Sequence, residues 1–479
     1  MIKLKKISKD FFTYGFGILL ARLISFFLIP IYTRVFTPAD YGTIEMLIVV
    51  SNFLGMIMFL GMDATQSNFF FKLKKQGHIT QARIISAILQ LRIIWGGIII
   101  LFSTILAPLI NFWVFQGILS LKYFIITFIG VLFTQIMSQS AEVMRLLYRP
   151  RGFTIIILSQ SILSAFLILI FIYIFNGGIL GFFLGTTMST LIVAFFGWYN
   201  IKSYILFNKF HYKLWPILLS FGLPFVPVEL AFYLMSNIDR WFIMYYHGPT
   251  KLGLFAIAAK FSMIIALIVE TFRKTWLPFS LDAMYTRNGS ETFRLIAHVY
   301  VGCACAGVIM LTFFSPLLIK YLTGAEFHQA WPLVGVLAWQ SVFYGFFTIS
   351  SAGIWKSGKT YLNIYLMFFA AIISILLNWY LVPIFEGLGA AIASASAFFS
   401  YAVMSLLVSQ YYWKINFQIS AIIIKILLSL IFMISFLYFK PGNNLITFFS
   451  ALVLSILLIF FSLPQYKNII IKCYKNYFN

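Results

Sequence analysis

The chain has 479 residues, of which 62% are hydrophobic and only 10% are charged. So little polar material cannot cover a water-soluble globule of this size, which excludes a soluble protein and indicates one that uses lipid as its solvent. The formal net charge is +22, which in a soluble protein would raise the question of a nucleic-acid partner. In a membrane protein the cytoplasmic loops carry an excess of Lys and Arg that contacts anionic lipid head groups, so we expect no nucleic acid as a partner.

Apolar segments follow one another along the whole chain. The hydrocarbon core of a bilayer is about 30 Å thick and needs about 20 apolar residues per helical crossing, and about fourteen segments reach that length. Pro, Gly and Asn mark the junctions, as at Gly248-Pro249, and the connections are too short to hold an enzymatic domain. The sequence therefore predicts an all-α integral membrane protein whose function is built inside the helix bundle. The expected spans are residues 11–36, 41–71, 84–110, 122–147, 153–175, 179–206, 216–246, 251–284, 292–320, 331–355, 360–383, 387–413, 418–439 and 444–463.

Lys and Arg concentrate in alternate connections between the expected spans. If the amino terminus is cytoplasmic, the even-numbered connections carry most of these cations, among them Lys72, Arg149 and Lys356. The outward connections hold few, such as Lys122. Because cytoplasmic loops of membrane proteins are enriched in Lys and Arg, we expect both termini to be cytoplasmic.

A loose motif of the first half recurs about 207 residues later. Both copies would begin on the cytoplasmic side, so the sequence predicts two parallel six-helix halves, residues 1–210 and 211–416. Residues 417–479 fall outside the duplication and are expected to form two further transmembrane helices and a cytoplasmic tail. The motif comprises Tyr14-Gly15, Pro30, Arg34 and Asp40-Tyr41-Gly42 in the first copy, and Ser220-Phe221-Gly222, Pro224, Pro227, Asp239-Arg240 and Leu252-Gly253-Leu254-Phe255 in the second.

Several basic side chains fall inside the expected spans, where an ionised group costs at least ~2.5 kcal/mol. Arg22 and Lys260 lie deepest, and we expect them to face a water-filled cavity between the two halves. Guanidinium and ammonium groups both suit phosphate, so this cavity is expected to bind an anionic head group. Basic residues near a span end have an alternative role, because they can extend to the lipid head groups. The substrate-binding candidates are Arg22, Lys260, Arg240, Arg34, Arg92, Arg273 and Lys274.

Acidic residues in the spans are candidates for binding a coupling ion, either H⁺ or Na⁺. They lie on polar stripes that can equally serve to join helices by hydrogen bonds, and the sequence does not choose between these roles. We expect no cofactor and no enzymatic activity. Cys303, Cys305 and Cys473 are expected to be packing residues, and the five His residues lack the spacing of a metal site. The coupling-ion candidates are Asp63, Glu142, Glu229 and Glu270.

The opening of the chain resembles that of a known family. Its motifs Tyr14-Gly15, Arg22, Pro30-Ile31-Tyr32-Thr33-Arg34 and Pro38-Ala39-Asp40-Tyr41-Gly42 are similar to those of bacterial polysaccharide flippases of the Wzx type, in the multidrug/oligosaccharidyl-lipid/polysaccharide (MOP) exporter superfamily. The resemblance implies two six-helix lobes in a V, two extra carboxyl-terminal helices and alternating access. It also implies a cargo, an undecaprenyl-pyrophosphate-linked oligosaccharide repeat unit of O-antigen, capsule or exopolysaccharide, which moves from the cytoplasmic to the periplasmic leaflet.

The same resemblance implies a location and partners. We expect a multi-pass protein of the bacterial inner membrane that acts as a monomer, contacts anionic membrane lipids, and works with a polysaccharide polymerase and a chain-length regulator. Two alternatives within the superfamily stay open. A lipid II flippase would bind the same pyrophosphate, whereas a multidrug or cation antiporter should favour acidic residues in its cavity. Pro30, Pro224, Pro227 and Pro278 are expected to let helices bend during transport.

Overall fold

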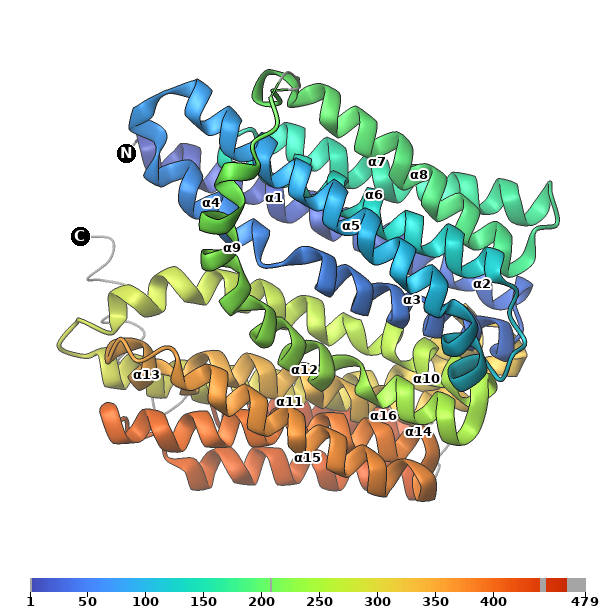
Figure 1. Cartoon of the computed structure of the whole chain (residues 1–479). Coiled ribbons are helices and arrows are strands. Elements are labelled where there is room, and N and C mark those ends of the chain that lie inside the picture. Colours follow the sequence, from blue (N-terminus) through green and yellow to red (C-terminus); the bar gives the residue numbers. More distant parts are fainter. Residues whose placement is uncertain (1, 207–208, 440–444, 463–479) are drawn as a thin grey trace. The chain divides into compact units, whose positions relative to one another are not determined.

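The computed structural model describes residues 2–206, 209–439 and 445–462 (Figure 1). Within these ranges every regular element is helical, as the sequence predicts. Contacts divide the chain into two compact units: unit 1 comprises Met1–Phe36 and Thr43–Tyr233, and unit 2 comprises Thr37–Gly42 and Leu234–Asn479. This division falls inside a long helix, later in the chain than the repeat boundary expected at residues 210 and 211, which remains a prediction about the duplication.

Unit 1 packs its helices around two apolar clusters. Helices α6 and α7 pack against α8, and α1 packs against α7. The larger cluster contains Ile85, Val143 and Val193, and the smaller one joins Met62 to Leu218. The helices are α1 (Ile2–Phe27), α2 (Ile29–Val35), α3 (Pro38–Phe59, whose first turn belongs to unit 2), α4 (Met62–Lys72), α5 (His78–Phe115), α6 (Leu121–Leu146), α7 (Pro150–Tyr173), α8 (Gly178–Asn200) and α9 (Trp215–Gly222), with 3₁₀ segments at Lys74–Gln76, Lys202–Tyr204, Tyr212–Leu214 and Leu223–Phe225.

Unit 2 is organised around α11 and α12. Helix α12 packs against α11 and α14, and α11 also carries the two carboxyl-terminal helices α15 and α16. The helices are α10 (Val226–Ala283, whose beginning belongs to unit 1), α11 (Gly289–Leu322), α12 (Trp331–Ser350), α13 (Ala352–Lys356), α14 (Leu362–Tyr412), α15 (Ile419–Phe439) and α16 (Leu445–Phe460), with a 3₁₀ segment at Ala325–Ala330.

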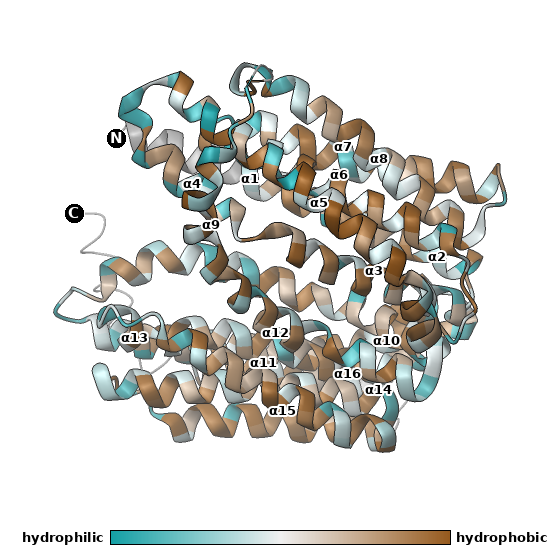
Figure 2. Cartoon of the chain, viewed as in Figure 1, coloured by the Kyte–Doolittle hydropathy of each residue, from teal (hydrophilic) through white to brown (hydrophobic). Residues whose placement is uncertain are grey.

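The spans of the described residues are consistent with the expected number, which stays a prediction. Eleven helical stretches are long and apolar enough to cross a membrane, and one shorter apolar helix covers Ile446–Phe460. Two of the eleven, α10 and α14, each contain a non-helical residue, Gly248 and Glu386, at which the chain turns into a second span. With these two counted double and the shorter helix added, fourteen spans result. Figure 2 shows hydrophobic residues along the helices and hydrophilic residues gathered at their ends. The tail expected at residues 463–479 lies outside the described residues.

Two of the expected spans in unit 1 are bent. The first is divided at Leu28, and Pro30 occupies the first turn of the helix that follows. The second is divided at Leu60 and Gly61, which both have positive φ angles, 49° and 68°. A side chain at Gly61 would overlap the backbone of Gly222, so glycine is needed here both for its conformation and for the close passage of α9.

Glycine also permits a close helix crossing in unit 2. Gly42, in the first turn of α3, lies against the backbone carbonyl of Pro249, and Gly253 of α10 lies against the carbonyl of Pro38. Each glycine follows its proline by four residues, so the same Pro-x-x-x-Gly pattern forms both sides of a reciprocal contact. Both glycines belong to the repeated motif. Small residues at helix crossings allow the backbones to approach closely in membranes.

A buried lysine attaches the carboxyl-terminal helices to α11. Lys425 of α15 is only 5% exposed, and its Nζ donates to Ser462 Oγ at 2.7 Å and lies 3.4 Å from His298 Nδ1. The other ring nitrogen of His298 donates to the carbonyl of Phe417 at 2.9 Å. The proton of the neutral ring is therefore on Nε2, and Nδ1 is the nitrogen that faces the lysine as an acceptor.

Candidate functional site

Arg22 and Lys260 are partly buried predicted substrate ligands for which the described residues supply no counter-charge. Arg22 lies on α1 in unit 1, and Lys260 lies on α10 in unit 2, beyond the break at Gly248. Both are partly buried. In the part of the chain that the structure describes, neither forms a hydrogen bond or an ion pair. Each unit therefore holds a partly buried cation that the described residues do not compensate.

Arg92 is fully buried in unit 1 and paired. Its guanidinium forms an ion pair with Asp63 at the start of α4 and donates to the carbonyl of Gln135 in α6 at 2.9 Å. Gln135 in turn donates to the carbonyl of Gly55 in α3 at 2.9 Å. This network favours the helix-joining role of Arg92 over contact with cargo, although its role as a ligand stays a prediction.

Asp63 has a second carboxylate beside it. Glu229, at the start of α10 and within unit 1, is exposed and close enough to Asp63 for the two negative charges to repel each other. Of the two carboxylates, Asp63 is the one that pairs with the Arg92 guanidinium. This group has the composition of a site that could accept one further cation.

Glu142 is already neutralised. It is 7% exposed, and its Oε1 accepts from Ser67 Oγ at 2.9 Å and from Arg145 at 2.7 Å. Ser67 lies on α4, whereas Glu142 and Arg145 lie near the end of α6. Glu142 therefore serves in this structure to join α4 to the end of α6.

Unit 2 holds a cluster of three charges on α10. Glu270 pairs with Arg273 at 3.0 Å and with Lys274 at 3.4 Å. The Arg273 guanidinium also lies 3.9 Å from the ring centroid of Tyr344 and donates to Thr348 at 3.1 Å. Two cations share one carboxylate, so the cluster keeps a net positive charge, and stacking fixes the guanidinium in one orientation.

Arg240 is held by a residue that was not among the candidates. Asp239 is 1% exposed, and its carboxylate accepts from the Arg240 side chain at 2.9 Å and from Ser394 of α14 at 3.0 Å. Arg240 also donates to the carbonyl of Ser236. The sequence shows an acid directly beside a base inside a span, Asp239-Arg240, but the role of Asp239 as the partner of Arg240 emerges only from the structure.

The remaining candidate, Arg34, is exposed at the end of α2 and has no hydrogen bond or ion pair among the described residues. This position agrees with its alternative role at the membrane interface. A search of the described residues for three or more His, Cys, Asp or Glu side chains that could hold a metal ion found no such group.

Comparisons with known proteins place the chain in a family. A family model described as "Polysaccharide biosynthesis protein" matches residues 7–284, and a second model, MatE, matches residues 224–380. Protein 1 of the Lsg locus of Haemophilus influenzae (strain Rd) is 22% identical over 284 residues, which cover 58% of this chain and 67% of that protein.

Solved structures show the same fold. The lipid II flippase MurJ in an inward closed conformation has a TM-score of 0.72 at 16% identity and covers 95% of this chain and 99% of its own. A multidrug resistance MATE family transporter of the MOP superfamily, in an inward-facing conformation, has a TM-score of 0.64 at 14% identity, over 84% of this chain and 95% of its own. The chain therefore belongs to the polysaccharide biosynthesis protein family, as a multi-pass inner-membrane protein with the flippase and transporter fold of the MOP superfamily.

Proposed function

We propose that this protein flips undecaprenyl-pyrophosphate-linked oligosaccharide repeat units from the cytoplasmic to the periplasmic leaflet, by alternating access through a cationic cavity. The observation that carries the proposal is the presence of Arg22 and Lys260 in apolar spans with no acidic partner in the described chain. An ionised side chain at this depth costs at least ~2.5 kcal/mol unless a ligand or partner compensates it. A pyrophosphate supplies the missing anion.

The role proposed for each other basic candidate depends on whether a carboxylate already neutralises its charge. Arg273 and Lys274 share Glu270 and keep a net positive charge, so they are proposed as secondary ligands of the pyrophosphate. Arg240 and Arg92 are each paired with a carboxylate, and we assign them the role of holding helices together.

The membrane potential favours the proposed direction. Moving an anion outward across an inside-negative membrane gains ~2.3 kcal/mol per charge per 100 mV. If an ion is coupled to transport, the proposed site is the pair of carboxylates Asp63 and Glu229, because they lie close enough to repel each other and Arg92 forms its ion pair with Asp63. Glu142 and Glu270 are already neutralised by bases.

Transport in reconstituted vesicles tests the proposal. Arg22→Ala and Lys260→Ala should each lower the rate of flipping of an undecaprenyl-pyrophosphate-linked oligosaccharide by about tenfold or more, because a hydrogen bond to a charged group contributes about 1.5–3 kcal/mol. Arg22→Lys keeps the charge but loses the fork of donors, so its rate of flipping should lie between those of the wild type and Arg22→Ala. Lys122→Ala, at an exposed position at the start of α6, is the matched control. Unchanged flipping in both alanine variants would refute the proposal.

A lipid II flippase is the second candidate, favoured by the fold similarity to MurJ. Its cargo carries the same pyrophosphate, so loss of Arg22 would impair either function. Vesicles that contain the wild-type protein with both lipid II and a lipid-linked repeat unit would distinguish the two functions, because only the true cargo should be flipped rapidly. A cation antiporter is disfavoured, since unpaired cations would repel its cargo.

A further inference from the structure

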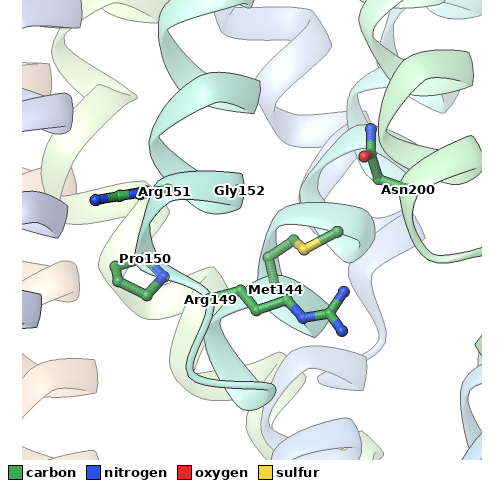
Figure 3. Close-up of a pocket in the computed structure, with 6 residues that line it drawn as sticks. All are labelled: Met144, Arg149, Pro150, Arg151, Gly152 and Asn200. Carbon is green, nitrogen blue, oxygen red and sulfur yellow. The ribbon is translucent and has the colours of Figure 1, made fainter.

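A pocket of about 400 Å³ lies in unit 1 where α6 ends, α7 begins and α8 ends (Figure 3). None of the candidate residues described above lines it. The lining residues are Met144, Arg149, Pro150, Arg151, Gly152 and Asn200.

The pocket has two cations and no acid. Arg149 and Arg151 are both exposed, and neither side chain forms a hydrogen bond or an ion pair with any residue that the structure describes. The nearest acid along the chain, Glu142, is already paired with Arg145. An uncompensated guanidinium at a cavity is chemically suited to a phosphate, which accepts from its fork of donors.

The shape of the pocket depends on one glycine. In Figure 3 the Arg149 side chain extends past Met144 on the side where Asn200 lies, whereas Arg151 extends from the other side of the first turn of α7. Asn200 uses one amide hydrogen for the carbonyl of Phe196, at 2.7 Å, so the rest of its amide remains available. A β-carbon at Gly152 would come within 2.9 Å of the Met144 sulfur, so a larger side chain there would fill the space.

Exposed aromatic residues beside the pocket indicate the level of the membrane at which it lies. Tyr148 and Tyr199, next to Arg149 and Asn200 in the chain, are 64% and 66% exposed. Lys202 lies over the ring of Tyr199, with its Nζ 4.3 Å from the centroid. Exposed tyrosines and basic residues at helix ends are typical of the level of the lipid phosphates. Basic pockets between transmembrane helices on the cytoplasmic side are suited to anionic head groups.

We infer that this pocket binds the phosphate of an anionic phospholipid from the leaflet at that end of unit 1, which the charge distribution predicts to be the cytoplasmic one. The lipid is a partner distinct from the cargo, because the site shares no residue with the proposed cargo ligands. Its phosphate neutralises Arg149, and the head group lies against Gly152 and Asn200.

Native mass spectrometry of the purified protein, titrated with phosphatidylglycerol in detergent, tests the inference. Arg149→Gln should weaken binding of the first lipid by about tenfold, since a hydrogen bond to a charged group contributes about 1.5–3 kcal/mol. Gly152→Leu should weaken it as much, although it changes no charge, because the leucine occupies the pocket. Arg287→Gln, at an exposed arginine between α10 and α11, is the matched control and should bind as the wild type does. Gel filtration and the melting temperature without lipid establish that each variant is folded.

Two outcomes would overturn the inference. If Gly152→Leu binds like the wild type while Arg149→Gln and Arg287→Gln lose affinity equally, the attraction is diffuse electrostatics. If inorganic phosphate raises the melting temperature as far as phosphatidylglycerol does, and does so only when Arg149 is present, the ligand is a soluble anion. The measurement involves no transport, so neither outcome bears on the proposed function.

Discussion

Arg92 shows how unit 1 keeps a charge inside its apolar core. The residue is 2% exposed, and its guanidinium is divided between the carboxylate of Asp63 and the carbonyl of Gln135. These contacts join α4, α5 and α6. Only the arginine is taken out of water, since the Asp63 side chain is 36% exposed, so loss of Asp63 would leave a buried guanidinium uncompensated. The arrangement therefore makes the position of α4 dependent on both residues.

Replacing Arg92 by Met should destabilise the protein by about 1.5–3 kcal/mol, because it removes the charge-assisted hydrogen bonds to Asp63, whose side chain is 36% exposed, and to the carbonyl of Gln135. The double variant Arg92→Met/Asp63→Asn should recover much of that loss. Thermal unfolding in detergent measures both effects. Arg34→Met, at an exposed position, serves as a control and should change stability by less than about 0.5 kcal/mol. A double variant as unstable as Arg92→Met alone would contradict this account.

At the scale of elements, the two longest helices of unit 2 turn at linked positions. Helix α10 turns at Gly248, where φ is 75°, and α14 turns at Glu386, where φ is 51°. Lys251 forms an ion pair with Glu386, and the Nε2 of His247 donates to the carbonyl of Val382 at 2.8 Å. One set of contacts therefore fixes both turns, which keeps four spans of unit 2 in register. The crossing of α3 with α10 begins directly beside them.

The reciprocal Pro-x-x-x-Gly crossing predicts a strong effect of added side chains. Gly42→Val and Gly253→Val would each push a methyl group into a backbone carbonyl, which cannot rotate away, so the helices must separate. Each variant should lose about 1–3 kcal/mol or more of stability. Melting temperature and the yield of monodisperse protein report the loss. Gly97→Val is the matched control, because an added β-carbon at this helical glycine of α5 meets no atom within 4 Å. Equal melting temperatures for all three variants would show that the crossing tolerates separation.

At the scale of the whole molecule, the sequence alone predicts the properties that depend on composition and on the length of apolar segments. The membrane class and the helical fold follow from apolar runs and from breakers such as Gly248-Pro249, and the structure agrees, with eleven helical stretches of the described residues long and apolar enough to cross a membrane. The pairing of Arg92 with Asp63 was not predictable, because it depends on which faces of α4 and α5 meet, and a single sequence does not contain that information. The role of Asp239 was not predictable for the same reason, because its partner Ser394 lies far along the chain and a single sequence does not show that the two meet.

The orientation that the charge distribution predicts can be tested directly. The cation-rich connections include the one where burial, together with Arg83 and Lys209, lowers the pKa of His211. Because such connections stay on the cytoplasmic side, single cysteines at Thr286 and Ser357 should be protected from a membrane-impermeant thiol reagent in intact spheroplasts. Cysteines at Gln116 and Asn176, which lie in cation-poor turns, should react. The native cysteines are first replaced by alanine, and permeabilised cells, in which all four positions should react, provide the control. Labelling at Thr286 but not at Gln116 would reverse the orientation, and with it the direction of the proposed export.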